Sequence, residues 1–444
     1  MISYEEQKLT LSNLHIFYEK KFQNYYKKFL FFSLAKKILV ALFFLLPWIM
    51  MIGRALADTI ILLIFLSFLI RSIFINDWNW MRFNWVFFSI LFWLSGLLSS
   101  FLLFKPFSHF ENGQIQALQA IALEGSFENG FAWLRFPIFA IACLYWLLKE
   151  REIKYFILLN IFLVISTLIL ISFFEIIFDP ILNSNFDTNF TWPFNNPLVG
   201  PYISKIGMPF ILISIYLYFN SRVQLKITSF IFIISYGYII LMTGNRVGCF
   251  SVFLSIFILL LYIKPKLSES IFFITIGIIF LLLFSYLNPN ILDRFSLYIF
   301  NENKTPTSLF QYKLLWKTSI NFFSSNILIG IGPTNFQGFL INNNISVYLK
   351  EHPHNHYLQA FTETGLLGGV SYLLMVFSIL IEAFRKKIKK SYKKTMFLAF
   401  VPIILTISLL WPFANGYDLY GQQQNSFLWY GIVIALSIFS RKTA

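Results

Sequence analysis

Residues 155–174 read YFILLNIFLVISTLILISFF and contain no charged side chain. A stretch of about 20 apolar residues is long enough for a helix to cross the hydrocarbon core of a lipid bilayer. Because no water is available there, the backbone must satisfy its own hydrogen bonds, and a long unalternating run favours a helix over a barrel strand. The stretch therefore predicts a membrane-spanning helix.

Similar apolar runs occur along the whole chain. The protein has 444 residues, of which 57% are hydrophobic and only 12% are charged. A soluble domain needs more charged residues on its water-exposed surface, so this composition excludes one. We therefore predict an all-α polytopic membrane protein with about twelve transmembrane helices. The runs begin near Ile38, Leu56, Phe83, Phe131, Tyr155, Ile203, Ile227, Val247, Ile271, Tyr357, Thr395 and Phe427.

The formal net charge of +15 is distributed unevenly between the two sides of these runs. If the N-terminus is cytoplasmic, most of the 35 Lys and Arg residues fall in the inward segments, as the positive-inside rule requires. Both termini are then cytoplasmic, and the charge needs no nucleic-acid partner. The basic inward segments are 1–37, the turn with Arg71 and Arg82, 149–154, 222–226, 264–266, 385–394 and 441–442.

The longest connection between apolar runs is 288–356, which this topology places on the outer side. Within it, Leu309 to Phe323 has the spacing of an amphipathic helix, so we predict that the connection is a folded subdomain. No cleavage site follows the first apolar run, so the first helix is expected to stay as an anchor. Cys143 and Cys249 each lie within an apolar run, which favours buried core residues over a disulfide or a thiolate metal site. The predicted division is an inner segment 1–37, transmembrane helices 1–9 in 38–287, the large outer loop 288–356, transmembrane helices 10–12 in 357–440 and an inner tail 441–444.

A few cations lie on the outer side, against the positive-inside rule. Arg246 follows Thr243-Gly244-Asn245 in a tight turn between two apolar runs, near the outer membrane boundary. A guanidinium at that depth can bind two phosphate oxygens of a lipid phosphate or pyrophosphate. The alternative is an arginine that only anchors the helix at the interface.

Three further outer cations are weaker candidates for the same anion. Arg135 and Lys205 are expected to begin helices on this side, where the helix N-terminus adds partial positive charge, although an anchoring role explains them as well. Lys313 precedes Trp316 by three residues on the predicted loop helix, which places both on one helical face. A solvated surface charge is the alternative for Lys313.

Three histidines crowd the segment Glu351-His352-Pro353-His354-Asn355-His356-Tyr357. Residues at i, i+2 and i+4 converge on one zinc ion only from an extended strand, and Pro353 together with the helix that follows disfavours that geometry. We therefore predict no metal site. A neutral imidazole can instead accept the proton of a hydroxyl group at physiological pH.

The sequence from here resembles a known family. His354-Asn355, followed after nine residues by Gly365 and after two more by Gly368, is similar to the signature of the O-antigen ligase and polymerase family of lipid-linked glycan transferases. The surrounding HNHYLQAFTETGLLGG (354–369) and the upstream SSNILIGIGPTNF (324–336) resemble that family too, as does the turn that carries Arg246. The resemblance covers about the C-terminal half of the chain, and twelve spans with one large outer loop fit the rest.

The resemblance implies a GT-C-like fold in the bacterial inner membrane, with the active site on the periplasmic face and no cofactor or metal. It implies a donor glycan carried by undecaprenyl pyrophosphate, with Arg246 holding the pyrophosphate and His354 acting as the base for the acceptor hydroxyl, with inversion at the anomeric carbon. Supporting roles are expected for Asn355, His356, Tyr357, Arg135 and Lys205. The second arginine of the family corresponds here to Lys313, which cannot make a two-point contact, so either Lys313 or Arg294 is expected to take that role.

The acceptor separates the remaining alternatives. A ligase would transfer the glycan to a lipid A-core sugar, a polymerase would join lipid-linked repeats, and a protein O-oligosaccharyltransferase would use a serine or threonine. The full histidine signature favours the ligase. A transporter for the same lipid is disfavoured because its ionisable groups would lie at mid-bilayer rather than in outer loops.

Overall fold

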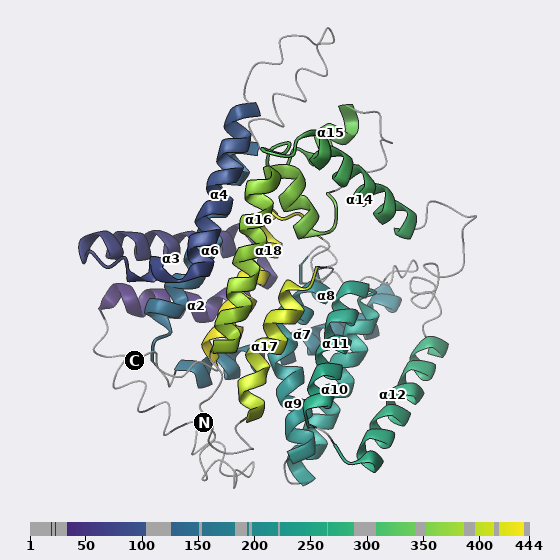
Figure 1. Ribbon diagram of the computed structural model, residues 1–444. Helices are drawn as coiled ribbons and strands as arrows, with labels where there is room; N and C mark the ends of the chain where they lie inside the picture. The colour runs from purple at the N-terminus through teal and green to yellow at the C-terminus, as the bar shows by residue number, and fades with distance from the viewer. Residues whose placement is uncertain are drawn as a thin grey trace.

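The structure is a computed structural model. It describes residues 33–103, 126–150, 153–182, 193–194, 198–220, 223–263, 265–287, 308–342, 352–385, 396–412 and 417–438, together with Glu19 and Gln23. All regular secondary structure within these ranges is helical (Figure 1). The helices are α2 (Leu34–Ile52), α3 (Arg54–Phe74), α4 (Asn84–Leu103), α6 (Arg135–Ala142), α7 (Ile153–Leu182), α8 (Val199–Tyr202), α9 (Met208–Asn220), α10 (Val223–Met242), α11 (Arg246–Ile263), α12 (Leu267–Leu287), α14 (Ser308–Ser325), α15 (Phe336–Asn342), α16 (His356–Arg385), α17 (Met396–Leu410) and α18 (Gln422–Ile438), with short turns η2 (Asn79–Arg82), η3 (Cys143–Leu147) and η4 (Ile203–Gly207).

Each predicted apolar run falls on one of these helices. Within the described ranges, 8 helices are long and apolar enough to cross a membrane, which supports a multi-pass membrane protein. The apolar helices at 246–261 and 401–410 are shorter than a full span. The total of about twelve spans therefore stays a prediction.

Among the helices that the structure describes, α4 and α16 make the most extensive contact. Small residues let the two backbones approach, since a Cβ at Gly368 would lie 3.2 Å from Cβ of Ser95, and a Cβ at Gly96 would lie 3.7 Å from Cγ2 of Thr364. Ser99 Oγ donates to the Glu363 carbonyl oxygen at 3.0 Å, near the end of α4 and the start of α16. The two helices therefore run antiparallel.

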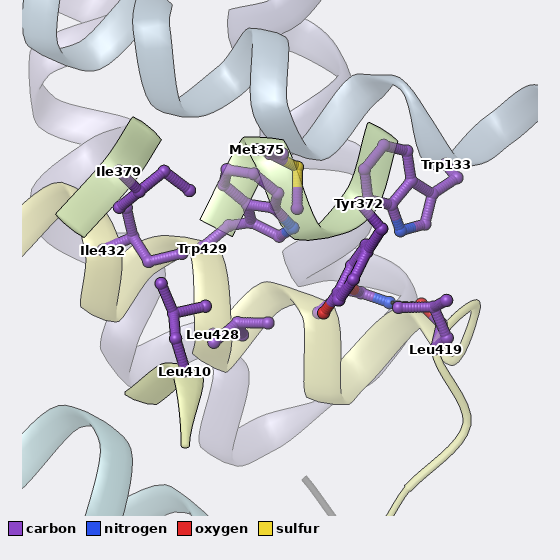
Figure 2. Close-up of a pocket in the computed structure, with 10 residues that line it drawn as sticks. Trp133, Tyr372, Met375, Ile379, Leu410, Leu419, Leu428, Trp429 and Ile432 are labelled. Carbon is purple, nitrogen blue, oxygen red and sulfur yellow. Dashed lines mark hydrogen bonds between the residues drawn. The ribbon is translucent and has the colours of Figure 1, made fainter. Parts of the chain in front are cut away.

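The interior beside this pair is aromatic. Figure 2 shows Trp133, Tyr372 and Trp429 around a space between the helices that is too narrow for a water molecule. The Trp133 and Trp429 rings meet edge to face with centroids 6.1 Å apart, and Trp85 lies 6.2 Å from Trp429 on another side. Large rings packed at these distances bind α4, α16 and α18 and the segment around Trp133 into one core.

The helix α14 covers the segment 309–323, so the helix predicted there is confirmed, while the folded outer subdomain 288–356 stays a prediction. In Figure 1, α14 and α15 lie over the end of α16 at which His356 begins the helix. The two helices share a small apolar cluster, separate from the main core, of Leu315, Phe322, Ile331, Phe336 and Leu340. This cluster holds α14 against α15 and the segment around Ile331.

Candidate functional site

The helix α16 begins directly after the histidine segment, and Asn355 fixes where it starts. Asn355 Oδ1 accepts hydrogen bonds from the backbone N–H groups of Tyr357 at 3.0 Å and Leu358 at 3.2 Å. This is the usual arrangement of a helix N-cap, which satisfies donors that the first turn leaves without partners. Asn355 therefore sets the start of α16 directly after His354.

His354 stands just outside this cap in an uncommon backbone conformation. Its φ angle is +51°, in the left-handed region that a residue with a side chain adopts at a cost of about 1–2 kcal/mol. The imidazole is only partly buried and lies against two rings, with centroids 5.1 Å from Tyr312 and 4.4 Å from His352. The conformation turns the ring toward α14 and leaves part of it accessible.

The helix α14 holds the histidine segment in place. Trp316 Nε1 donates to the Pro353 carbonyl oxygen at 3.0 Å, and the Tyr312 and Trp316 rings lie one turn apart with centroids at 6.2 Å. Lys313 lies on the same helix, but its side chain is exposed to the surroundings. The ammonium group is therefore available to an anion that reaches the outside of α14.

His356 has different surroundings from His354. Its ring is buried, with Nε2 3.0 Å from the Tyr417 carbonyl oxygen and Nδ1 3.4 Å from the Tyr372 hydroxyl. Because a carbonyl can only accept, Nε2 must carry the hydrogen, and Nδ1 is left to accept from Tyr372. Within the described ranges, no three His, Cys, Asp or Glu side chains are arranged to hold a metal ion.

The turn before α11 presents Arg246 as the first residue of that helix. Gly244 has a φ of +59°, and Asn245 caps the helix by accepting from the Gly248 N–H at 2.6 Å. The turn packs tightly against the segment 199–207, since a Cβ at Gly200 would lie 2.6 Å from Cβ of Asn245. Arg246 is half-buried, close to the helix N-terminus, where partial positive charge also favours an anion.

Lys205 lies beside this turn, in the π-helical turn η4. The sequence predicts that Lys205 begins a helix. In the structure it does not, because the helical segment already starts at Val199. The side chain is only 6% exposed, and Nζ donates to Gln424 Oε1 at 3.3 Å. A buried lysine amino group that bonds to Gln424 marks this region as polar within an otherwise apolar fold.

The two remaining cations of the prediction are placed differently. Arg135 is buried, and its Nε donates to Asp58 Oδ1 at 2.7 Å while Nη1 donates to the Ala132 carbonyl oxygen. Its charge is thus already balanced by α3. Arg294 lies outside the described residues.

The helix α16 is interrupted at Gly365, and its backbone there bonds to residues 327–332, which follow α14. Gly365 has φ +67° and ψ −164°, so the helix is interrupted there, and the freed carbonyls of Thr362 and Glu363 accept from the N–H groups of Ile331 and Gly332 at 3.0 and 2.8 Å. The Leu366 N–H in turn donates to the Ile327 carbonyl at 2.7 Å. Irregular backbone at membrane depth is tolerated only when protein groups satisfy it in this way.

A buried polar network lies just below the cap and was not predicted from the sequence. Gln359 Nε2 donates to Asp418 Oδ1 at 2.6 Å and Glu363 Oε2 at 3.1 Å, while its Oε1 accepts from the Leu419 N–H at 2.9 Å. Burial, together with Glu363 and Asp418, raises the pKa of Tyr420 well above its usual range, and burial raises the pKa of Tyr417 to about 12. Both phenols therefore stay neutral, and the network fixes the segment whose Tyr417 carbonyl holds His356.

Part of this chain is similar to a known protein family. Residues 229–373 match the family model described as O-Antigen ligase, and no curated protein matches. The matched segment contains Arg246, Lys313, His354 and the broken first half of α16. The resemblance to the O-antigen ligase and polymerase family is therefore confirmed by the family model over residues 229–373.

Proposed function

We propose that the protein is an O-antigen ligase of the bacterial inner membrane. It transfers a glycan from undecaprenyl pyrophosphate to a sugar hydroxyl of lipid A-core on the periplasmic face, with inversion and without a metal ion. The observation that carries the proposal is a chain of contacts between three segments. The Arg246 turn packs on the segment with Lys205, and Lys205 Nζ donates to Gln424 at the start of α18. The residues just before α18 hold the start of α16, since the Tyr417 carbonyl oxygen accepts from His356 Nε2.

His354 is the base in this reaction. It removes the proton from the acceptor hydroxyl as the hydroxyl oxygen attacks the anomeric carbon of the donor. The bond from that carbon to the pyrophosphate oxygen breaks, and undecaprenyl pyrophosphate leaves with the electron pair. The partly exposed ring and its fixed backbone support this role, because a general base has to reach the substrate in one defined position.

Arg246 stabilises the leaving pyrophosphate. A guanidinium at a helix N-terminus combines a full charge, a two-point contact and the partial charge of the helix, all directed at the group that gains charge. Lys205 adds a buried amino group nearby, and Lys313 or Arg294 adds a cation from the 288–356 segment. Asn355, His356 and Tyr357 keep the start of α16 in place, since Tyr357 Oη donates to the Leu410 carbonyl oxygen.

The acceptor decides between the ligase and its alternatives, the O-antigen polymerase and the protein O-oligosaccharyltransferase. All three would use the same donor and the same base. The test expresses the gene in a strain that makes lipid-linked O-antigen but lacks its own ligase, followed by gel separation of the lipopolysaccharide. Long chains on lipid A-core establish the ligase.

Two variants make this test specific for the site. His354→Ala and Arg246→Ala should abolish the long chains while the protein accumulates in the membrane at the wild-type level. His352→Ala should be tolerated, because we assign it no chemistry. Long chains with the His354→Ala variant, or no long chains with accumulated wild-type protein, would contradict the proposal.

A further inference from the structure

A separate polar pocket lies at the opposite end of α16 from the histidine segment. Its volume is about 340 Å³, and it lies between the start of α4 and the last turns of α16. Pockets that bind small molecules begin at about 300 Å³. Because α16 has 30 residues, this pocket and His356 are separated by the length of a whole membrane span.

The lining of this pocket combines positive charge with an apolar wall. Arg82 and Arg385 contribute two guanidinium groups, against the single carboxylate of Glu382, and Asn79 adds an amide. Trp85 and Ile381 supply apolar surface beside them. A phosphate group with an attached acyl chain has the matching chemistry, since guanidinium groups bind its oxygens and the apolar wall accepts the chain.

The turn that carries Arg82 is held rigidly. Trp80 is 2% exposed, and its Nε1 donates to Ser72 Oγ at 3.1 Å. Arg71, on the preceding helix, pairs with Asp77 at 3.5 Å, and Asp77 also accepts from the Tyr145 hydroxyl at 3.0 Å. The backbone of the turn that carries Arg82 is thus fixed against α3 before any ligand binds, which lowers the entropy cost of binding.

The pocket lies at the ends of membrane-spanning helices, where the head group of a lipid would be. Arg82 lies in the connection between two membrane-spanning helices, and Arg385 ends a third. Basic pockets between transmembrane helices at this boundary bind the head groups of anionic lipids, and tryptophans such as Trp78 and Trp80 are common at the same depth.

We propose that this pocket binds the phosphodiester head group of an anionic phospholipid, which bridges the α4–α16 pair at the membrane face opposite the candidate active site. The proposal does not depend on the glycan reaction. A head group held by Arg82 and Arg385 joins the two helices at one end, as the hydrogen bond from Ser99 joins them at the other.

The experiment reconstitutes the full-length protein in nanodiscs that contain phosphatidylcholine with a small fraction of phosphatidylglycerol. Bound phosphatidylglycerol is counted by native mass spectrometry after release from the nanodisc. The double variant Arg82→Gln/Arg385→Gln should bind phosphatidylglycerol about 10- to 30-fold more weakly, because each cation near the membrane surface contributes about tenfold or less. Glu382→Gln, which removes the only carboxylate of the lining, should bind it more tightly.

A matched control removes two cations elsewhere on the same membrane face. Lys36 lies close enough to Arg71 for their charges to interact, so Lys36→Gln/Lys37→Gln makes the same change in net charge at the same boundary. That variant should retain the wild-type affinity for phosphatidylglycerol. Equal loss in both double variants, or no loss in either, would overturn the proposal.

Two further arms complete the test. Inorganic phosphate at millimolar concentration should not displace the lipid, and displacement would assign the pocket to a soluble phosphate instead and overturn the lipid. Size-exclusion profiles and thermal unfolding identify a variant that fails to fold. If the double variant fails to fold, the test rests on Glu382→Gln alone. Unchanged or weaker binding of phosphatidylglycerol by Glu382→Gln would then contradict the proposal.

Discussion

The Arg135 guanidinium and the Asp58 carboxylate form an ion pair that joins α6 to α3. The side chains are 8% and 23% exposed, so removing one partner leaves the other partly buried and without its counter-charge. Arg135→Met or Asp58→Leu alone should lower the free energy of unfolding by about 1–3 kcal/mol, less than for a fully buried pair because Asp58 is partly accessible. Thermal unfolding of the purified variants measures this effect.

The control for this prediction is the double variant Arg135→Met/Asp58→Leu. It should be more stable than either single variant, because no uncompensated charge remains. Glycan transfer per folded molecule should stay at the wild-type level in all three. A loss of transfer in folded Arg135→Met would instead give Arg135 a direct part in donor binding.

Gly330 and Gly365 are required by the backbone at the break of α16. Both have positive φ, and a Cβ at Gly330 would lie 2.5 Å from the Glu363 carbonyl carbon, while one at Gly365 would meet the Leu328 carbonyl group. Gly365→Ala should destabilise the protein by at least about 1–2 kcal/mol from the φ angle alone. The yield of monodisperse protein after heating measures the loss.

Gly277 in α12 is a matched control, since a Cβ there would meet no atom within 4 Å. Gly277→Ala should leave stability unchanged or slightly higher, because alanine has the higher helix propensity. Equal stability of Gly277→Ala and Gly365→Ala would contradict the interpretation of the break.

At the scale of the element, α14 acts as the support for His354. Trp316→Phe removes the hydrogen bond to Pro353 but keeps an aromatic ring, so the protein should fold while the histidine segment becomes less well fixed. We expect kcat for glycan transfer to fall by about tenfold or more, since small displacements of a catalytic group are costly. Lys317→Gln, an exposed neighbour on the same helix, should have no effect on positioning.

The helix α16 illustrates how far sequence reasoning reaches. The apolar run that begins near Tyr357 predicts a helix, and the structure confirms it, but nothing in the local pattern indicates the break at Gly365. The glycine adopts its conformation because Ile327, Ile331 and Gly332 replace the lost helical hydrogen bonds. That partner segment lies more than 30 residues upstream, so a reading of local periodicity cannot find it.

At the scale of the whole molecule, the all-helical, multi-pass fold class was predictable because lipid imposes simple rules, while the count of twelve spans and their orientation stay predictions. Apolar runs must form helices, and the loops must carry their cations on one side. The candidate site was predictable only in part. Arg246 and His354 stand out by residue type, whereas the burial of Lys205, the Asp58 partner of Arg135 and the Gln359 network depend on contacts between distant segments.

In the proposed reaction, side chains alone supply the positive charge that stabilises the leaving pyrophosphate. Because Arg246, together with Lys313 or Arg294, would supply the positive charge for the pyrophosphate, removal of divalent metal ions with a chelator should leave the rate of glycan transfer unchanged. The assay compares purified protein before and after chelation. A loss of activity that Mg²⁺ or Mn²⁺ restores would show that a metal ion carries part of the leaving-group stabilisation.

The central claim is that His354 is the base and Arg246 holds the leaving group. The most direct test measures transfer from an undecaprenyl pyrophosphate-linked glycan to lipid A-core by the purified protein in vesicles, comparing wild type with His354→Ala and Arg246→Lys. We predict that His354→Ala lowers kcat by about 10²–10⁴-fold, and that Arg246→Lys retains part of the rate because it keeps the charge but loses the two-point contact. Wild-type kcat in folded His354→Ala would contradict the account.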